Sequence, residues 1–325
     1  MFCKVLDSRV SRSIGIIITN QCNAECDFCC NNSGPNQKTR LSLQEVLSII
    51  KQANELGFKQ ICFTGGEPTI LLSDILIAGE LITSLGMSMT INSNGLFGKN
   101  KSKALKILTS LKKVGLVKVT LSFDDSHAKY IPAISVKNVI QICRDLDISI
   151  HLTSAFYTDG NRLNHYFSEQ DLLDVIVSEN PVQSSGRAQN RHDLYPSGEI
   201  PQDLCPSPFN MVVNFDGKIY PCCSVSGFTK SIELGHISNI QLEHAIAKTI
   251  ENKFLFYIQK RGLSDFFESS IVYNPMIKNA HSVCDLCKIV SENDFFYEKT
   301  LKFIDSEFYR FGLETLNKIH DIDQQ

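Results

Sequence analysis

Three cysteines near the start of the chain have the residue type and spacing that redox or metal chemistry requires. Cys22, Cys26 and Cys29 follow the pattern C-x3-C-x2-C, which lets one short loop wrap three thiolates around an iron-sulfur cluster. Such clusters normally take four cysteines, so three protein ligands leave one iron open. An open position separates a catalytic metal from a structural one. Two other interpretations are a structural zinc site with Cys30 as the fourth ligand and a chance grouping of thiols.

Four other cysteines form a second candidate ligand set. A predicted β-hairpin over residues 209–222 would bring Cys205 and Cys222 together, and a C-x2-C turn adds Cys284 and Cys287. Four thiolates would complete the coordination of an iron-sulfur cluster or of a zinc ion. The sequence does not separate these two metals.

The helices and strands that must position these cysteines alternate regularly along the first part of the chain. This alternation of strand-like runs and helical patterns predicts a parallel sheet. The strands are expected at 13–20, 59–64, 88–93, 117–123 and 148–156, and the helices at 73–85, 101–113, 134–145 and from Ser42, where Ser42 and Glu45 form a capping box. A further helix, opened by Ser168 and Asp171, should lead to a last segment at 182–188. Six such units predict an α/β partial (β/α)6 barrel.

The texture of the sequence changes after Ala188, where it becomes polar and rich in proline. We therefore expect two domains, a barrel over residues 1–189 and a smaller α+β domain over residues 190–325. The second domain contains two alternating runs around Asp216 and Gly217, which predict the hairpin.

Composition and charge argue against a nucleic-acid-binding or membrane-spanning protein. The formal net charge of -3 gives no basic field for nucleic acid, and no apolar run is long enough for a membrane span. The N-terminal residues show no export signal, so we expect a soluble cytoplasmic protein, as a monomer. Because cytosolic thiols stay reduced, the 12 cysteines favour metal binding or catalysis over disulfides.

Polar residues are expected where the strands end, which is where sheets of this class place their ligands. The candidates in chain order are Gly65, Gly66, Glu67 and Pro68, then Asn92 and Ser93, then Ser122 and Asp124, and finally Arg187. Two glycines allow a backbone to approach a ligand closely. The alternatives are turn capping for the polar residues and a surface position for the arginine. His127 is a weaker candidate, because a lone histidine is more often structural.

With Phe28 directly before Cys29, the cysteine spacing and the Gly-Gly-Glu-Pro turn resemble the radical S-adenosylmethionine (SAM) superfamily. The resemblance implies a 4Fe-4S cluster on three cysteines, with SAM bound to its open iron and cleaved to a 5'-deoxyadenosyl radical. It also implies that the Gly-Gly-Glu-Pro turn binds the amino group of SAM, with Glu67 facing the ammonium. Asn92 or Ser93 would contact the ribose, and Arg187 would pair with the carboxylate.

The second cysteine set resembles the Twitch form of the SPASM extension, which carries one auxiliary 4Fe-4S cluster. The resemblance implies Cys205, Cys222, Cys284 and Cys287 as its ligands, and no cysteines remain for a second auxiliary cluster. Cys223 is left over beside this set. A free thiol can give a hydrogen atom to a carbon radical, whereas the alternative is a packed small residue.

The pair Cys222-Cys223, the chain length and the single auxiliary module resemble epimerases of ribosomally made peptides. This resemblance implies abstraction of a Cα hydrogen from a precursor peptide, return of hydrogen by Cys223, and a reducing partner such as flavodoxin or ferredoxin. The alternative is oxidation or crosslinking of a peptide or small molecule, with the auxiliary cluster accepting the electron. A non-enzymatic protein with two structural zinc sites would leave the Gly-Gly-Glu-Pro turn unexplained.

Overall fold

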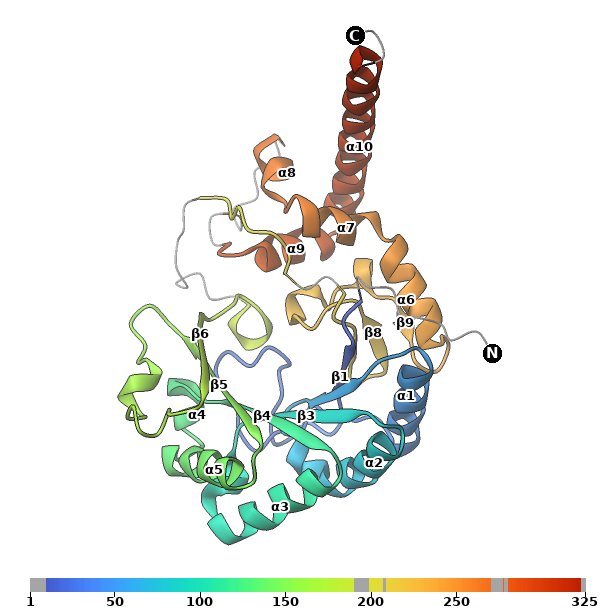
Figure 1. The fold of residues 1–325 in the computed structure, drawn as a ribbon. Helices are drawn as coiled ribbons and strands as arrows, with labels where there is room; N and C mark the ends of the chain where they lie inside the picture. Colours follow the sequence, from blue (N-terminus) through green and yellow to red (C-terminus); the bar gives the residue numbers. More distant parts are fainter. Residues whose placement is uncertain (1–9, 190–198, 207–208, 270–276, 278–279, 323–325) are drawn as a thin grey trace.

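The computed structural model describes residues 10–189, 199–206, 209–269, 277 and 280–322 (Figure 1). Its strands are β1 (Ser13–Ile17), β2 (Gln60–Thr64), β3 (Ser88–Ser93), β4 (Leu116–Ser122), β5 (Ser149–Phe156), β6 (Ile176–Pro181), β7 (Val212–Val213), β8 (Lys218–Tyr220) and β9 (Gly235–His236). They form one sheet in the order β6-β5-β4-β3-β2-β1-β7-β8-β9. Strands β1 to β6 are all parallel, and β6 does not pair back to β1. The predicted partial barrel is therefore confirmed.

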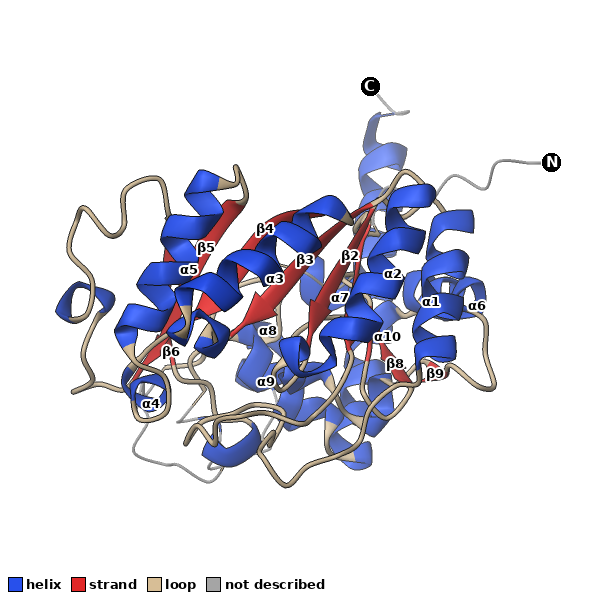
Figure 2. Cartoon of the chain, turned by 90° about the horizontal axis from the view of Figure 1, so that it is seen from below, coloured by secondary structure: helices blue, strands red, loops and turns tan. Residues whose placement is uncertain are grey.

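Helices cover the outer face of the parallel strands, as Figures 1 and 2 show for α1, α2, α3 and α5. The barrel helices are α1 (Leu43–Glu55), α2 (Leu72–Ser84), α3 (Lys101–Lys113), α4 (Asp125–Ala128) and α5 (Ala133–Asp145). The C-terminal helices are α6 (Leu242–Glu251), α7 (Lys253–Lys260), α8 (Ser264–Ser269), α9 (Val283–Ser291) and α10 (Asp294–Ile322). Helices α7 to α9 lie toward the open side of the curved sheet (Figure 1).

Helix α1 begins at the predicted capping box. The Ser42 backbone N–H donates to the Glu45 carboxylate over 2.7 Å, and the Glu45 N–H donates to the Ser42 hydroxyl over 3.2 Å. This exchange satisfies two N–H groups that a helix start leaves without intrahelical partners. Since the capping box orients the first turn of the helix, it also fixes where the loop preceding α1 must end.

The sixth strand lies earlier in the chain than the sequence predicts. The Ser168–Asp171 box forms, with the Ser168 N–H 2.9 Å from the Asp171 carboxylate, but it closes a turn rather than opening a helix. Strand β6 follows at Ile176–Pro181, and the expected segment 182–188 is a loop that ends in a short 3-10 turn. The prediction failed because β6 is a largely exposed edge strand, so no buried face imposes an alternating pattern on its sequence.

The predicted hairpin is present and extends the barrel sheet. Strands β7 and β8 pair antiparallel around a turn in which Gly217 has φ +84°, and β7 also pairs with β1. Residues of the hairpin and of α6 belong to the main hydrophobic core, whereas α7, α8 and α9 enclose a second core. The sheet thus runs through the expected boundary at 189/190, and the division into two domains stays a prediction. None of the described helices combines the length and apolar composition that a bilayer crossing requires.

Candidate active site

The first cysteine group lies on the loop that joins β1 to α1. Cys22 and Cys26 are buried and Cys29 is half-buried, and all three line one cavity of about 600 Å³. The loop is folded on itself, because the Cys22 N–H donates to the Gly34 carbonyl over 3.1 Å. Burial raises the pKa of Cys22 to about 12, so this thiol needs a bound metal to become a thiolate at neutral pH.

Each of the three sulfurs receives at least one N–H donor, and one donor for each comes from a different part of the chain. They are the backbone of Ser33 to Cys29 Sγ (3.3 Å), Asn94 Nδ2 to Cys22 Sγ (3.7 Å) and the imidazole of His127 to Cys26. Donors of this kind stabilise negative charge on sulfur and tune the potential of a cluster. The set of three thiols therefore fits a cluster that keeps one iron open.

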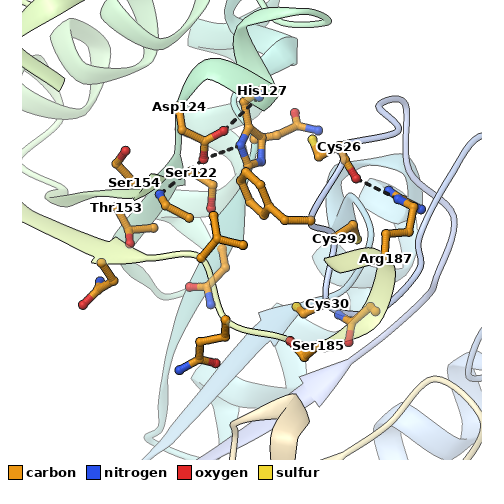
Figure 3. A pocket seen from close by; sticks show the side chains of 18 of the residues that line it. Cys26, Cys29, Cys30, Ser122, Asp124, His127, Thr153, Ser154, Ser185 and Arg187 are labelled. Carbon is orange, nitrogen blue, oxygen red and sulfur yellow. Dashed lines mark hydrogen bonds and ion pairs between the residues drawn. The ribbon is translucent and has the colours of Figure 1, made fainter. Parts of the chain in front are cut away.

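His127 links the cysteine loop to the end of β4. Its Nδ1 lies 2.8 Å from Asp124 Oδ2 (Figure 3). Its ring meets the Phe28 ring edge-on, with 6.0 Å between the ring centroids. Burial lowers the pKa of His127, but the hydrogen bonds to Asp124 and Cys26 outweigh it and raise the pKa to about 10. The imidazole thus carries a positive charge beside Cys26.

Arg187 clamps the cysteine loop from the other end of the barrel. Its Nε donates to the Cys26 carbonyl over 2.7 Å (Figure 3). Its Nη1 donates to the Ser33 carbonyl over 2.7 Å. Gly186 permits this approach: its φ is +55°, and a Cβ there would lie 2.2 Å from the Cys29 carbonyl oxygen. The remaining Nη2 is buried and has no hydrogen-bond partner among the described residues. The two N–H groups of Nη2 are therefore not committed to the cysteine loop and could pair with a carboxylate.

The Gly-Gly-Glu-Pro turn packs against the chain's own backbone. A Cβ on Gly66 would lie 2.2 Å from the Gln21 carbonyl oxygen, so the glycine is needed for contact with the cysteine loop. Glu67 is fully buried below the cavity and accepts hydrogen bonds from Ser93 and from the backbone of Asn94. Burial raises the pKa of this carboxyl. Glu67 thus ties the end of β2 to the end of β3, and neither it nor Pro68 lines the cavity.

Most of the predicted site residues converge on the cavity. Those that line it are Cys22, Cys26, Phe28, Cys29, Gly65, Gly66, Asn92, Ser93, Ser122, Asp124 and Arg187. Cys30, the fourth ligand in the alternative zinc interpretation, is an exposed residue at the cavity. Because the carboxyl ends of parallel strands meet at one edge of a sheet, distant polar residues are gathered there.

Several lining residues are absent from the sequence prediction. They come from the ends of β5 and β6 and from the start of α9, and they include Thr153, Ser154, Asn180, Gln183, His281, Ser282 and Asp285. The two strand ends follow the same rule that located Asn92, so their positions were available from the pattern. Helix α9 offered no such signal, because only the tertiary fold brings it over the cavity.

The second cysteine set also converges. Cys287 is buried, and its thiol interacts electrostatically with Cys222, Cys284 and Cys205. Burial raises the pKa of Cys222 to about 12 and that of Cys284 to about 11. Cys284 and Cys287 lie three residues apart on α9, and therefore on one face of the helix. Four gathered thiols fit an auxiliary cluster, although within the described residues no three Cys, His, Asp or Glu side chains are close enough to hold a single metal ion.

Cys223 is exposed at the end of the hairpin and does not line the cavity as the described side chains enclose it. Its thiol is hydrogen-bonded to the Asn210 side chain, although burial of the sulfur raises its pKa. It is also near enough to Cys62, on β2, to influence that thiol electrostatically. Cys223 therefore lies between the second cysteine set and the interior of the barrel.

Comparison with known proteins agrees with this geometry. Residues 16–160 match the Radical SAM superfamily. The chain is 27% identical to "Putative peptide biosynthesis protein YydG" of Bacillus subtilis (strain 168), over 92% of this chain and 99% of that protein. It is 32% identical to a GTP 3',8-cyclase of Listeria welshimeri, over 39% of this chain and 38% of the cyclase.

Two solved structures share the fold. One is BtrN in complex with AdoMet and 2-DOIA, with a TM-score of 0.51 and 16% identity, covering 88% of this chain and 96% of BtrN. The other is anSMEcpe with bound AdoMet, with a TM-score of 0.55 and 14% identity, covering 92% of this chain and 97% of anSMEcpe. These two structures agree with the partial-barrel fold, and the family match shows that the chain contains a radical SAM domain, with residues 16–160 belonging to that superfamily.

Proposed function

We propose that this chain is a radical SAM epimerase that converts an L-residue of a precursor peptide to the D-form. The observation that carries the proposal is the position of Cys223, an exposed residue directly beside the gathered second cysteine set. The chain's likeness to a putative peptide biosynthesis protein, over 92% of its length, favours a peptide substrate.

The first cysteine group and the cavity beside it would hold the two cofactors that start the reaction. When bound, the cluster on Cys22, Cys26 and Cys29 and its SAM supply a carbon radical that removes one hydrogen atom from the substrate. Asn92, Ser93 and Arg187 line the cavity that would hold SAM, and Arg187 Nη2 has no hydrogen-bond partner among the described residues. Their hydroxyl, amide and guanidinium groups suit its ribose and carboxylate.

Cys223 would then complete the inversion. Its S–H bond breaks and a C–H bond forms at the substrate Cα, on the face opposite to the one that lost hydrogen. The thiol is left as a thiyl radical, so one electron and one proton must return to it in each turnover. A flavodoxin or ferredoxin is the proposed source of the electron, and the second cysteine set, with an auxiliary 4Fe-4S cluster, is its proposed route.

The test screens short reading frames near this gene as candidate precursor peptides, each incubated in deuterated water with reconstituted enzyme, SAM and reductant. Wild-type protein should give a product of unchanged covalent structure with one deuterium at a D-residue. Cys223→Ala should still cleave SAM but give no D-residue. Cys143→Ala, which removes a buried thiol on α5 remote from both cysteine sets, is the matched control. D-residue formation by the Cys223 variant would refute the proposal.

The same experiment separates epimerisation from oxidation. Oxidation or crosslinking removes hydrogen atoms, so the peptide product would be lighter and no deuterium would be required at Cα. A lighter product with wild-type enzyme would assign the second cysteine set to electron removal from the substrate, and Cys223 would lose its proposed role.

A further inference from the structure

One wall of the cavity comes from the start of α9, which is far from the cysteine loop in the sequence. Asp285 lies there and is only 6% exposed. Its Oδ2 accepts hydrogen bonds from the His281 backbone N–H (3.0 Å) and from the Ser282 hydroxyl (3.1 Å). Its Oδ1 is buried and has no hydrogen-bond partner among the described residues. The two oxygens of this carboxylate therefore have different surroundings.

Helix α9 is held firmly against the barrel. Lys288 Nζ donates to the Ser184 carbonyl over 3.0 Å. The Val283 N–H donates to the Asp203 carboxylate over 2.9 Å. These contacts fix the first turns of α9, so the position of Asp285 is set before any ligand arrives.

The other carboxylate on the cavity wall is already engaged. Asp124 accepts hydrogen bonds from the backbone of Ser126 and from both the backbone and the ring of His127. A buried carboxylate oxygen that lacks a donor is unfavourable, and a ligand that brings an N–H group to it recovers the lost hydrogen bond. Asp285 is thus an acceptor that awaits a donor from within the cavity.

We propose that Asp285 Oδ1 accepts a hydrogen bond from an N–H group of the bound substrate. The inference rests on the proposed function, since a peptide supplies such groups in its backbone amides and in lysine or arginine side chains. Asp285 would then hold the substrate between the cysteine loop and α9. This makes it a substrate-binding residue that acts beside, and separately from, Cys284 and Cys287.

The experiment measures the affinity of the fluorescently labelled neighbouring-gene peptide for reconstituted enzyme with SAM and without reductant. Asp285→Asn is the informative variant. Its single amide oxygen can keep both hydrogen bonds at the start of α9, which leaves the amide NH2 facing the cavity as a donor. Glu292→Gln removes a carboxylate at the C-cap of α9, outside the cavity, and serves as the control.

We expect Asp285→Asn to weaken peptide binding about 10- to 100-fold. A charge-assisted hydrogen bond is lost, and the NH2 group of the asparagine then faces the N–H group of the substrate. Glu292→Gln should bind like wild type, and the iron and sulfide content of both variants should be unchanged. Peptides with lysine or arginine replaced by norleucine, or with single N-methylated amides, identify the source. The peptide that lacks the bonded N–H group should bind wild-type protein more weakly than the unmodified peptide does. Asp285→Asn should bind both peptides with the same affinity.

Peptide binding by Asp285→Asn within twofold of wild type would overturn the inference and leave the proposed function standing. Failure of wild-type protein to bind the peptide at all would overturn the proposed function, and the inference with it. Loss of iron in Asp285→Asn alone would show that the carboxylate supports the second cysteine set, which also contradicts a binding role.

Discussion

The guanidinium of Arg187 binds the carbonyl oxygen of Cys26 over 2.7 Å, across 161 residues of sequence. This contact joins the chain after β6 to the loop that carries the first cysteine group. It also explains how an open barrel, whose edge strand β6 does not pair with β1, keeps that loop in a fixed shape. The side chain acts through its geometry, since its N–H groups diverge toward two carbonyls at once.

Replacing Arg187 by lysine should loosen the cysteine loop. Lysine keeps the charge but cannot reach the Cys26 and Ser33 carbonyls together, so we expect the free energy of unfolding to fall by about 1–3 kcal/mol. Less iron should also be retained after reconstitution. Anaerobic urea unfolding and iron analysis measure both effects. Arg40→Lys, at an exposed ion pair with Asp74, should change stability by less than about 1 kcal/mol. Equal effects of the two variants would contradict the clamp.

Replacing His127 by asparagine should make the first cluster harder to reduce. The positively charged imidazole donates to Cys26, and this bond stabilises the added negative charge of a reduced cluster. Its loss should lower the reduction potential by roughly tens of millivolts. A redox titration followed by electron paramagnetic resonance measures the shift. His165→Asn, whose ring packs edge-on against Tyr166, is the control. An unchanged potential in the His127 variant would show that the contact is only structural.

Much of the barrel was predictable because its buried strands and amphipathic helices have strict periods. Helix α3, expected at 101–113, spans Lys101–Lys113, and β3, expected at 88–93, spans Ser88–Ser93. The sequence shows no such hydrophobic period at β6, because both faces of that strand are largely exposed. Hydrophobic pattern records burial, so an element that buries little leaves little trace in the sequence.

The candidate site was predictable where a local rule applies and obscure where the tertiary fold decides. The cysteine spacing and the strand-end rule located Cys22, Asn92 and Ser122, all of which line the cavity. Glu67 was expected to face a ligand, yet burial and its hydrogen bonds hold it beneath the cavity. Asp285 was missed, because its place depends on how α9 docks, and docking is not written in any short motif.

Replacing Gly66 by alanine should damage the SAM site without touching a functional side chain. The new Cβ would lie 2.2 Å from the Gln21 carbonyl oxygen, so the turn and the cysteine loop must separate. We expect a loss of about 1–3 kcal/mol in unfolding free energy, as for other overpacked sites, and weaker SAM binding in equilibrium dialysis without reductant.

Gly34→Ala is the matched control for this variant. Gly34 lies in the cysteine loop, but a Cβ there would meet the Glu25 carboxylate at 3.6 Å, an ordinary contact. It should therefore bind SAM like wild type. Wild-type SAM affinity in Gly66→Ala would mean that the turn and the loop are not coupled.

Replacing Cys287 by alanine should remove the auxiliary cluster that we propose for the second cysteine set and leave the first cluster intact. Because Cys287 is the buried member of its set and interacts with the other three thiols, the remaining ligands should not retain a cluster. Reconstituted protein should then hold about four iron atoms per chain in place of about eight. Cleavage of SAM should persist, since the first cysteine loop is unchanged. Cys143→Ala, at a buried thiol of α5, should keep the full iron content. Zinc in wild-type protein, or an unchanged iron content in Cys287→Ala, would exclude an auxiliary iron-sulfur cluster at this site.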